Sequence, residues 1–181
     1  MLKMAIQTKT YEDIERLFRI FESIEEKNDE LVKYVCAALV VCGKYYLQKT
    51  FRSRSLELFQ HAVKTAKNNI KILKEVILIL TESQLRKEAE LFFQFFPKTA
   101  RDSNEYAIAN LAVQDLGQEG AKVIELCEAI LKSENHDPIL YQIYIRRLAQ
   151  NLNLDKAKEF STEACQKWPS LKEKFEIPSA N

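Results

Sequence analysis

The stretch SLELFQHAVKTA, from Ser55 to Ala66, carries the pattern that decides the fold. A small residue stands at Ser55, an aromatic residue at Phe59 and a small residue at Ala62. These spacings lie on one face of an α-helix. A face that alternates small and large side chains predicts close packing against a second helix, with the aromatic ring filling the space between helices.

The same pattern returns every 34 residues, in windows that begin at Ala89, Val123 and Ala157. Each window reads as an amphipathic helix, and each follows a second apolar-periodic window. These preceding windows span Glu30–Gln48, Ile70–Ser83, Asn104–Leu116 and Ile139–Asn151. Paired helices at a fixed period indicate a helical solenoid, in which each pair buries its apolar faces against its neighbours.

The chain resembles the tetratricopeptide repeat (TPR) family, whose 34-residue motif has small, aromatic and small residues at positions 20, 24 and 27. With Ser55 at position 20, the units are 36–69, 70–103, 104–137 and 138–171, about three quarters of the chain. The match in the first unit includes Leu39, Cys42, Gly43 and Tyr46, and the match in the fourth includes Tyr141, Tyr144, Leu148, Ala157, Ala164 and Pro169. Ile77, Leu111 and Ile145 depart from the motif, because position 8 is usually small.

This resemblance implies an all-α fold, a right-handed α-α superhelix of four units. Residues 1–29 lie outside the units and contain an apolar helical pattern from Tyr11 to Lys27, which predicts an N-terminal capping helix. Residues 172–181 form a short tail. In it, Phe175 and Ile177 are expected to fold back onto the last helix, and Pro178 is expected to end any helix.

The composition excludes several functional classes. With 27 basic and 26 acidic residues the formal charge is +1, so no global field attracts nucleic acid or an anionic membrane. No apolar run approaches the roughly 20 residues of a membrane span, and the N-terminus lacks the apolar core of a signal peptide. The four cysteines form no metal-binding spacing, and we expect reduced thiols in a cytoplasmic protein.

No catalytic pattern appears in the sequence. His61 is expected on a helix and His136 in a turn, both as ordinary histidines. There is no glycine-rich phosphate loop and no nucleophile elbow. We therefore expect a protein that is not an enzyme and needs neither cofactor nor metal.

The resemblance also implies which residues form a groove, since the first helix of each TPR pair lines the concave side. The inward positions present apolar side chains and several cations, which suits a protein partner: an extended peptide or an amphipathic helix with some acidic residues. The alternative is that the chain's own cap or tail covers the groove. The predicted groove residues are Val40, Lys44, Leu47, Lys71, Lys74, Leu78, Ile108, Ala112, Asp115, Ile139, Gln142, Ile143 and Arg146.

The run LFFQFFPK raises a separate possibility on the outer face. Phe93 and Phe96 fit the core positions of the motif, and Phe92 is a candidate for the same face. Leu91 and Phe95 point elsewhere. They either pack under a neighbouring segment or form an apolar patch for self-association or a partner.

The leading hypothesis is a non-enzymatic adaptor or scaffold that binds a partner protein in the groove. One alternative is a secretion-type TPR chaperone that holds an apolar client and forms a homodimer through its N-terminal segment. An RNA-binding helical repeat is disfavoured by the period and the balanced charge. A clamp for the carboxylate tail of heat-shock chaperones is disfavoured because Glu75 and Glu105 occupy two of its positions.

Overall fold

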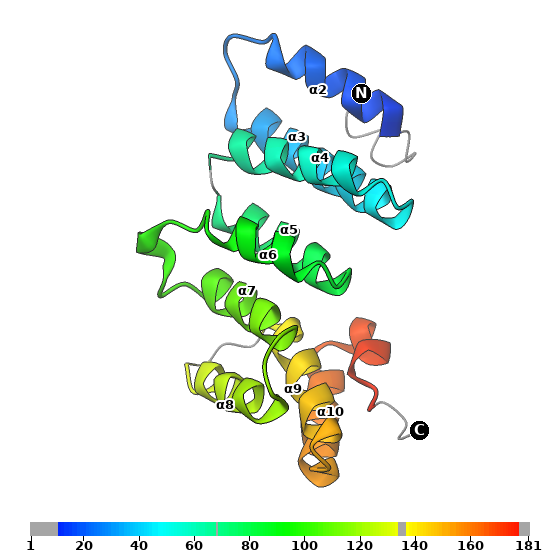
Figure 1. The fold of residues 1–181 in the computed structure, drawn as a ribbon, viewed down its shortest axis with the longest axis vertical. Coiled ribbons are helices and arrows are strands. Elements are labelled where there is room, and N and C mark those ends of the chain that lie inside the picture. The colour runs from blue at the N-terminus through cyan, green and yellow to red at the C-terminus, as the bar shows by residue number, and fades with distance from the viewer. Residues whose placement is uncertain (1–10, 68, 134–136, 178–181) are drawn as a thin grey trace.

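The computed structural model describes residues 11–67, 69–133 and 137–177, and all regular structure in them is helical. The prediction of an all-α fold is confirmed (Figure 1). The elements are α2 (Tyr11–Glu22), α3 (Asp29–Gln48), α4 (Arg52–Thr65), α5 (Ile70–Glu82), α6 (Arg86–Phe93), the 3₁₀ segment η1 (Lys98–Ala100), α7 (Asn104–Asp115), α8 (Gly120–Leu131), α9 (Pro138–Gln150), α10 (Leu154–Lys167) and the 3₁₀ segment η2 (Pro169–Phe175).

The helix boundaries repeat with the period of the sequence. Helices α5, α7 and α9 begin at positions 70, 104 and 138, and helices α4, α6, α8 and α10 begin at positions 52, 86, 120 and 154. Successive members of each series are therefore 34 residues apart. In the second, third and fourth units the structure places one helix pair within each 34-residue window, whereas α3 begins at Asp29, seven residues before the first unit. Each helix packs against its partner in the pair.

The turns within three of the four pairs, α3–α4, α5–α6 and α9–α10, repeat as well. Thr50, Gln84 and Leu152 all have positive φ, at 67°, 60° and 60°. In the first turn the N–H of Phe51 donates to the carbonyl of Tyr46 at 2.9 Å, and the bonds that follow Gln84 and Leu152 are equivalent. A left-handed residue followed by this bond is the Schellman ending of a helix, which usually carries glycine at the left-handed position.

Replacing Thr50 by glycine is therefore expected to stabilise the protein by about 1 kcal/mol, because a β-branched residue at φ 67° is strained and glycine is not. Urea unfolding followed by circular dichroism measures the change. The same replacement at Thr162, inside α10 and exposed, should destabilise by a similar amount. A loss of stability at both positions would show that strain at Thr50 is negligible.

Close packing of the first pair depends on Gly43 and Phe59. A Cβ atom on Gly43 would lie 2.5 Å from Cε1 of Phe59, a distance that no relaxed contact allows. The ring of Phe59 is completely buried and meets the ring of Phe92 edge-on, with centroids 6.4 Å apart. The absent side chain in α3 thus makes room for the large one in α4, and the aromatic ring extends the core to the next pair.

Successive pairs stack into an elongated molecule (Figure 1). Helices α2 to α7 form layers with similar axis directions, whereas α9 and α10 are turned steeply against them. The hydrophobic core follows this division: one cluster centres on α2 to α6 and a second on α7 to α10. Helix α7 contributes to both, through Ala109 and Val113 to the first and Ile108 and Leu111 to the second. It is the layer shared by the two halves.

Both ends of the stack are covered, the first by α2 before the units and the second by η2, which begins in the fourth unit and runs past it. Helix α2 packs against α3 and buries Ile14, Phe18 and Phe21, although it ends at Glu22 and not at Lys27 as expected. At the other end, η2 packs on α9 and α10 with Phe175 fully buried, and Ile177 joins the same cluster. Pro178 lies outside the described residues.

An ion pair fixes α2 onto α4. The Arg54 guanidinium donates to both carboxylate oxygens of Glu15, with Nε at 3.0 Å from Oε1. These hydrogen bonds from Arg54 lower the pKa of Glu15 below its usual value. A lowered pKa in the folded state stabilises the fold above the unfolded pKa of about 4.3 and loses that effect as the pH falls through the folded value.

The variant Glu15→Gln is accordingly expected to lose about 1 kcal/mol of stability at pH 7, a modest value because Arg54 is partly exposed. The difference from wild type should shrink as the pH falls below about 4 and vanish once the pH is below the folded-state pKa of Glu15. Urea midpoints measured across this range provide the test. Glu22→Gln, at an exposed position of the same helix, serves as control. A pH-independent difference would assign the effect to packing rather than to charge.

Candidate functional site

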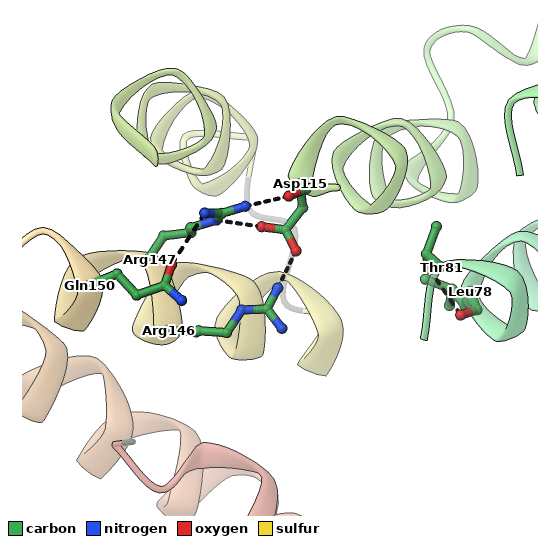
Figure 2. Close-up of polar contacts among 6 residues, drawn as sticks. All are labelled: Leu78, Thr81, Asp115, Arg146, Arg147 and Gln150. Carbon is green, nitrogen blue, oxygen red and sulfur yellow. Dashed lines mark hydrogen bonds and ion pairs between the residues drawn. The ribbon is translucent and has the colours of Figure 1, made fainter. Parts of the chain in front are cut away.

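A hollow of about 250 Å³ lies between α5, α7 and α9. Its wall on α5 includes Leu78 and Thr81, which Figure 2 shows across a gap from Asp115 and Arg146. Glu82, Gln84 and Leu116 complete the walls at the helix ends. The hollow brings together seven of the predicted groove residues, namely Leu78, Ala112, Asp115, Ile139, Gln142, Ile143 and Arg146.

Helix α9 supplies most of these side chains from a single face. Ile139, Gln142, Ile143 and Arg146 follow the spacing of residues on one side of a helix. The start of α9 is fixed by Asp137, whose Oδ1 accepts from the backbone N–H of Ile139 at 2.9 Å. This N-cap, followed by proline in the first turn, sets the direction of the helix.

An ion pair ties α5 directly to the start of α9. Nζ of Lys74 lies 3.0 Å from Oδ2 of Asp137, although the two residues are 63 positions apart. Lys74 stands one helical turn before Leu78, so the pair lies beside the hollow. Helices from the second and fourth pairs therefore approach each other over α7, which forms the floor of the hollow.

Asp115 is the buried charged group of the site, with 7% of its side chain exposed. Its Oδ1 accepts from Nε of Arg147 at 2.6 Å, and its Oδ2 accepts from Arg146 (Figure 2). Arg147 also donates to the backbone carbonyl of Asp115. Asp115 is the last residue of α7, where unpaired carbonyls and the helix dipole favour cations. The two arginines thus donate hydrogen bonds both to the carboxylate of Asp115 and to the backbone carbonyl at the end of α7.

The two arginines differ in their surroundings. Arg147 is 19% exposed, and its Nη1 donates to Oε1 of Gln150 at 3.2 Å. Arg146 is 46% exposed, lines the hollow and bonds only to Asp115 within the described part of the chain. A guanidinium has five N–H donors, so most of those on Arg146 are open to a ligand.

Gln142 adds a second donor to the same wall. Its Nε2 atom is buried and has no hydrogen-bond partner among the described residues. A buried polar atom without a partner carries a desolvation cost of about 1–3 kcal/mol. A small rotation of the Gln142 side chain on binding would bring this donor to an acceptor of a ligand in the hollow and remove the cost.

The remaining predicted groove residues lie elsewhere. Val40 and Ile108 are 1% and 0% exposed and belong to the two core clusters, so they contact no solvent. Leu47 is half-buried against the first cluster, and Lys44 pairs with Glu82 at 3.6 Å. Lys71 lines a different, larger hollow.

This larger hollow, of about 980 Å³, lies between α2, α3, the end of α4 and the start of α5. Its wall combines apolar side chains such as Phe21 and Val32 with lysines and carboxylates of similar number. Sequence reasoning missed it. No periodic signal marks it, because its shape depends on how the capping helix and the segment after it sit against the first pair.

Two apolar side chains of the run LFFQFFPK are exposed. Leu91 and Phe95 are 59% and 50% exposed, and Phe95 touches the ring of Phe92 at a centroid distance of 6.0 Å. Phe92 is the buried ring of this run, while Phe93 and Phe96 are half-buried around Tyr106. Helix α6 ends at Phe93, so Phe96 does not continue the helical face on which its predicted core position depended.

Titratable groups elsewhere have ordinary structural surroundings. His61 is half-buried and meets the ring of Phe18 at 4.9 Å, and His136 lies outside the described residues. Burial raises the pKa of Cys36 to about 11 and that of Cys127 to about 12. Cys42 is also buried, whereas Cys165 is partly exposed. No group of three His, Cys, Asp or Glu residues in the described ranges could hold a metal ion.

These thiols provide a test of the packing. One thiol of four, that of Cys165, is expected to react with Ellman's reagent within minutes at pH 8, because thiolates are the reactive form and the other three are buried. The remaining three should react only after urea unfolds the protein. Cys165→Ser should abolish the fast phase, whereas a fast phase of two or more thiols would mean that the core opens readily.

None of the helices in the described ranges is both long and apolar enough for a bilayer crossing. Comparison with known proteins found no match: no family model, no curated protein and no solved structure matches the chain.

Proposed function

We propose that this chain is a TPR-like, right-handed superhelix of four helix pairs, capped by α2, that acts as a non-enzymatic adaptor. In this proposal it binds a peptide or an amphipathic helix of a partner protein in the hollow between α5, α7 and α9. The observation that carries it is the convergence of seven predicted inward residues, from three successive first helices, on one hollow. Helical repeat proteins commonly bind partners on such concave surfaces.

The chemistry of the hollow favours a peptide over a small polar ligand. Leu78, Ile139 and Ile143 provide apolar contact, and Gln142 and Arg146 provide donors beside it. Peptide recognition in grooves uses this combination of pockets for side chains and hydrogen bonds to the main chain. The 34-residue recurrence of helix starts supports the repeat architecture.

Leu78→Glu tests the proposal directly. A carboxylate on this half-buried wall would place a charge against the apolar part of the ligand and would compete with the ligand for the open donors of Arg146, so binding should weaken strongly. Peptides selected from a random display library on the wild-type chain would be titrated against both proteins by fluorescence anisotropy. We expect at least a tenfold loss of affinity in the variant.

Leu91→Glu is the matched control, because it makes the same change on the exposed outer face. It should leave the affinity unchanged, and circular dichroism should show that both variants are folded. Peptides that lose affinity for Leu91→Glu instead would assign binding to the outer patch around Leu91 and Phe95. A library that yields no binder would refute the groove proposal.

The alternative hypotheses gain no specific support. The chaperone hypothesis depends on a free apolar face of the N-terminal helix, yet Ile14, Phe18 and Phe21 of α2 are buried within the chain. The RNA-binding hypothesis stays disfavoured by the balanced charge of the chain and by the apolar inward residues Leu78, Ile139 and Ile143. Homodimer formation stays a prediction, which sedimentation of the chain with and without residues 1–29 would measure.

A further inference from the structure

The proposed binding hollow carries an imbalance of charge. Asp115 supplies one negative charge to two guanidinium groups, so the trio with Arg146 and Arg147 keeps an excess positive charge. The other acid of the wall, Glu82, is 3.6 Å from Lys44 on α3. The excess positive charge lies at Arg146, because the donors of Arg147 are bonded to Asp115 and Gln150.

Two unsatisfied donor groups therefore stand on one face of α9. The free N–H groups of Arg146 and the unpartnered Nε2 of Gln142 belong to residues four positions apart, one helical turn or about 6 Å. Both residues line the hollow. A ligand that satisfies both must present two acceptors, and the one that meets Arg146 should be negatively charged.

We infer that the hollow recognises an acidic side chain of a partner peptide through Arg146, beside a backbone carbonyl that accepts from Gln142. The inference rests on the proposed function and specifies which peptides the hollow binds. Arg146 and Gln142 lie on neighbouring turns of one helix, so we expect the acidic residue to be close in sequence to the accepted carbonyl. An apolar side chain of the same peptide packs against Leu78 and Ile139 across the hollow.

The arrangement assigns different roles to two adjacent arginines. Arg147 is a positioning residue that holds α9 to the end of α7 through Asp115. Arg146 shares the same carboxylate but keeps its outer donors in solvent. Loss of Arg146 therefore leaves the contact between α7 and α9 in place, which makes it a suitable position for a binding test.

The experiment uses the full chain and the peptides selected from the random display library. We expect the selected sequences to share an Asp or Glu at a fixed spacing from an apolar position. Replacing that acid by its amide should weaken binding to wild type about fivefold to tenfold, since the contact is charge-assisted but half exposed. The same replacement should have no effect on Arg146→Gln, and Arg146→Lys should retain part of the discrimination.

The binding experiment includes two further variants, Gln142→Leu and Lys158→Gln. The first removes the orphan donor and should weaken every selected peptide, acidic or amidated, by a similar factor. The second removes an exposed cation of α10 and should change nothing. Thermal unfolding of each variant checks that the fold is retained.

The outcomes separate the two proposals. Peptides that lose affinity for Leu78→Glu but carry no common acid, or whose acid matters equally in Arg146→Gln, would overturn the assignment to Arg146 and leave the groove in place. Peptides indifferent to Leu78→Glu, or a library without binders, would overturn the groove and this inference with it. If replacing the acid of the peptide by its amide weakens binding to the wild type but not to Arg146→Gln, the result would support both the groove and the assignment to Arg146.

Discussion

Phe59→Ala is expected to lower the free energy of unfolding by about 4 kcal/mol, the largest effect of any single change considered for this chain. The ring is fully buried and contacts both Gly43 of its own pair and Phe92 of the next. Truncation therefore leaves a cavity that two layers share, and neither can fill it without moving a helix. Urea unfolding monitored by circular dichroism gives the change, and the melting temperature should fall by roughly 10 °C.

Phe51→Ala is the matched control, because Phe51 is 61% exposed and its loss should cost less than about 1 kcal/mol. A double-mutant cycle tests the mechanism. Gly43→Ala should destabilise the wild type, since its Cβ would collide with the ring of Phe59, and should be tolerated in Phe59→Ala. Additive effects of the two changes would contradict direct packing between these positions.

Asp115→Ala is expected to cost about 2–3 kcal/mol. The change removes the shared acceptor of two guanidinium groups and leaves the less exposed one, Arg147, without its carboxylate. Removing one partner of a buried pair usually costs 3–5 kcal/mol, and exposure of Arg146 reduces that value here. Because the pair joins α7 to α9, the second core cluster should unfold at lower urea than in wild type.

Asp102→Ala provides the comparison, since Asp102 is exposed in a turn and its loss should change stability by less than about 0.5 kcal/mol. Trp168 packs in the C-terminal cluster and reports on that half of the molecule by fluorescence. A fluorescence midpoint unchanged by Asp115→Ala would show that α9 is held to α7 by apolar packing alone.

The sequence by itself determined the helices and their period. The alternation of small and aromatic residues around Ser55 predicted paired helices, and the observed starts of α5, α7 and α9 fall within one residue of the predicted windows. Such signals are local, because spacing along one helix face depends only on backbone geometry. Seven of the inward positions of units two to four, which follow from the phase of the repeat, gather in one hollow, whereas Lys71, Lys74 and Ile108 lie outside it.

Other features were decided only by tertiary structure. The burial of Val40 and Ile108 depends on which neighbouring layers close over them, and a period does not contain that information. The same holds for the turn of α9 and α10 against the earlier layers and for the contact of Lys74 with Asp137, 63 residues away. The partnership of Asp115 with two arginines arises from the end of one helix meeting the side of another. Long-range packing and the pairing of buried charges select these arrangements, because each requires groups that are distant in the chain to be desolvated together.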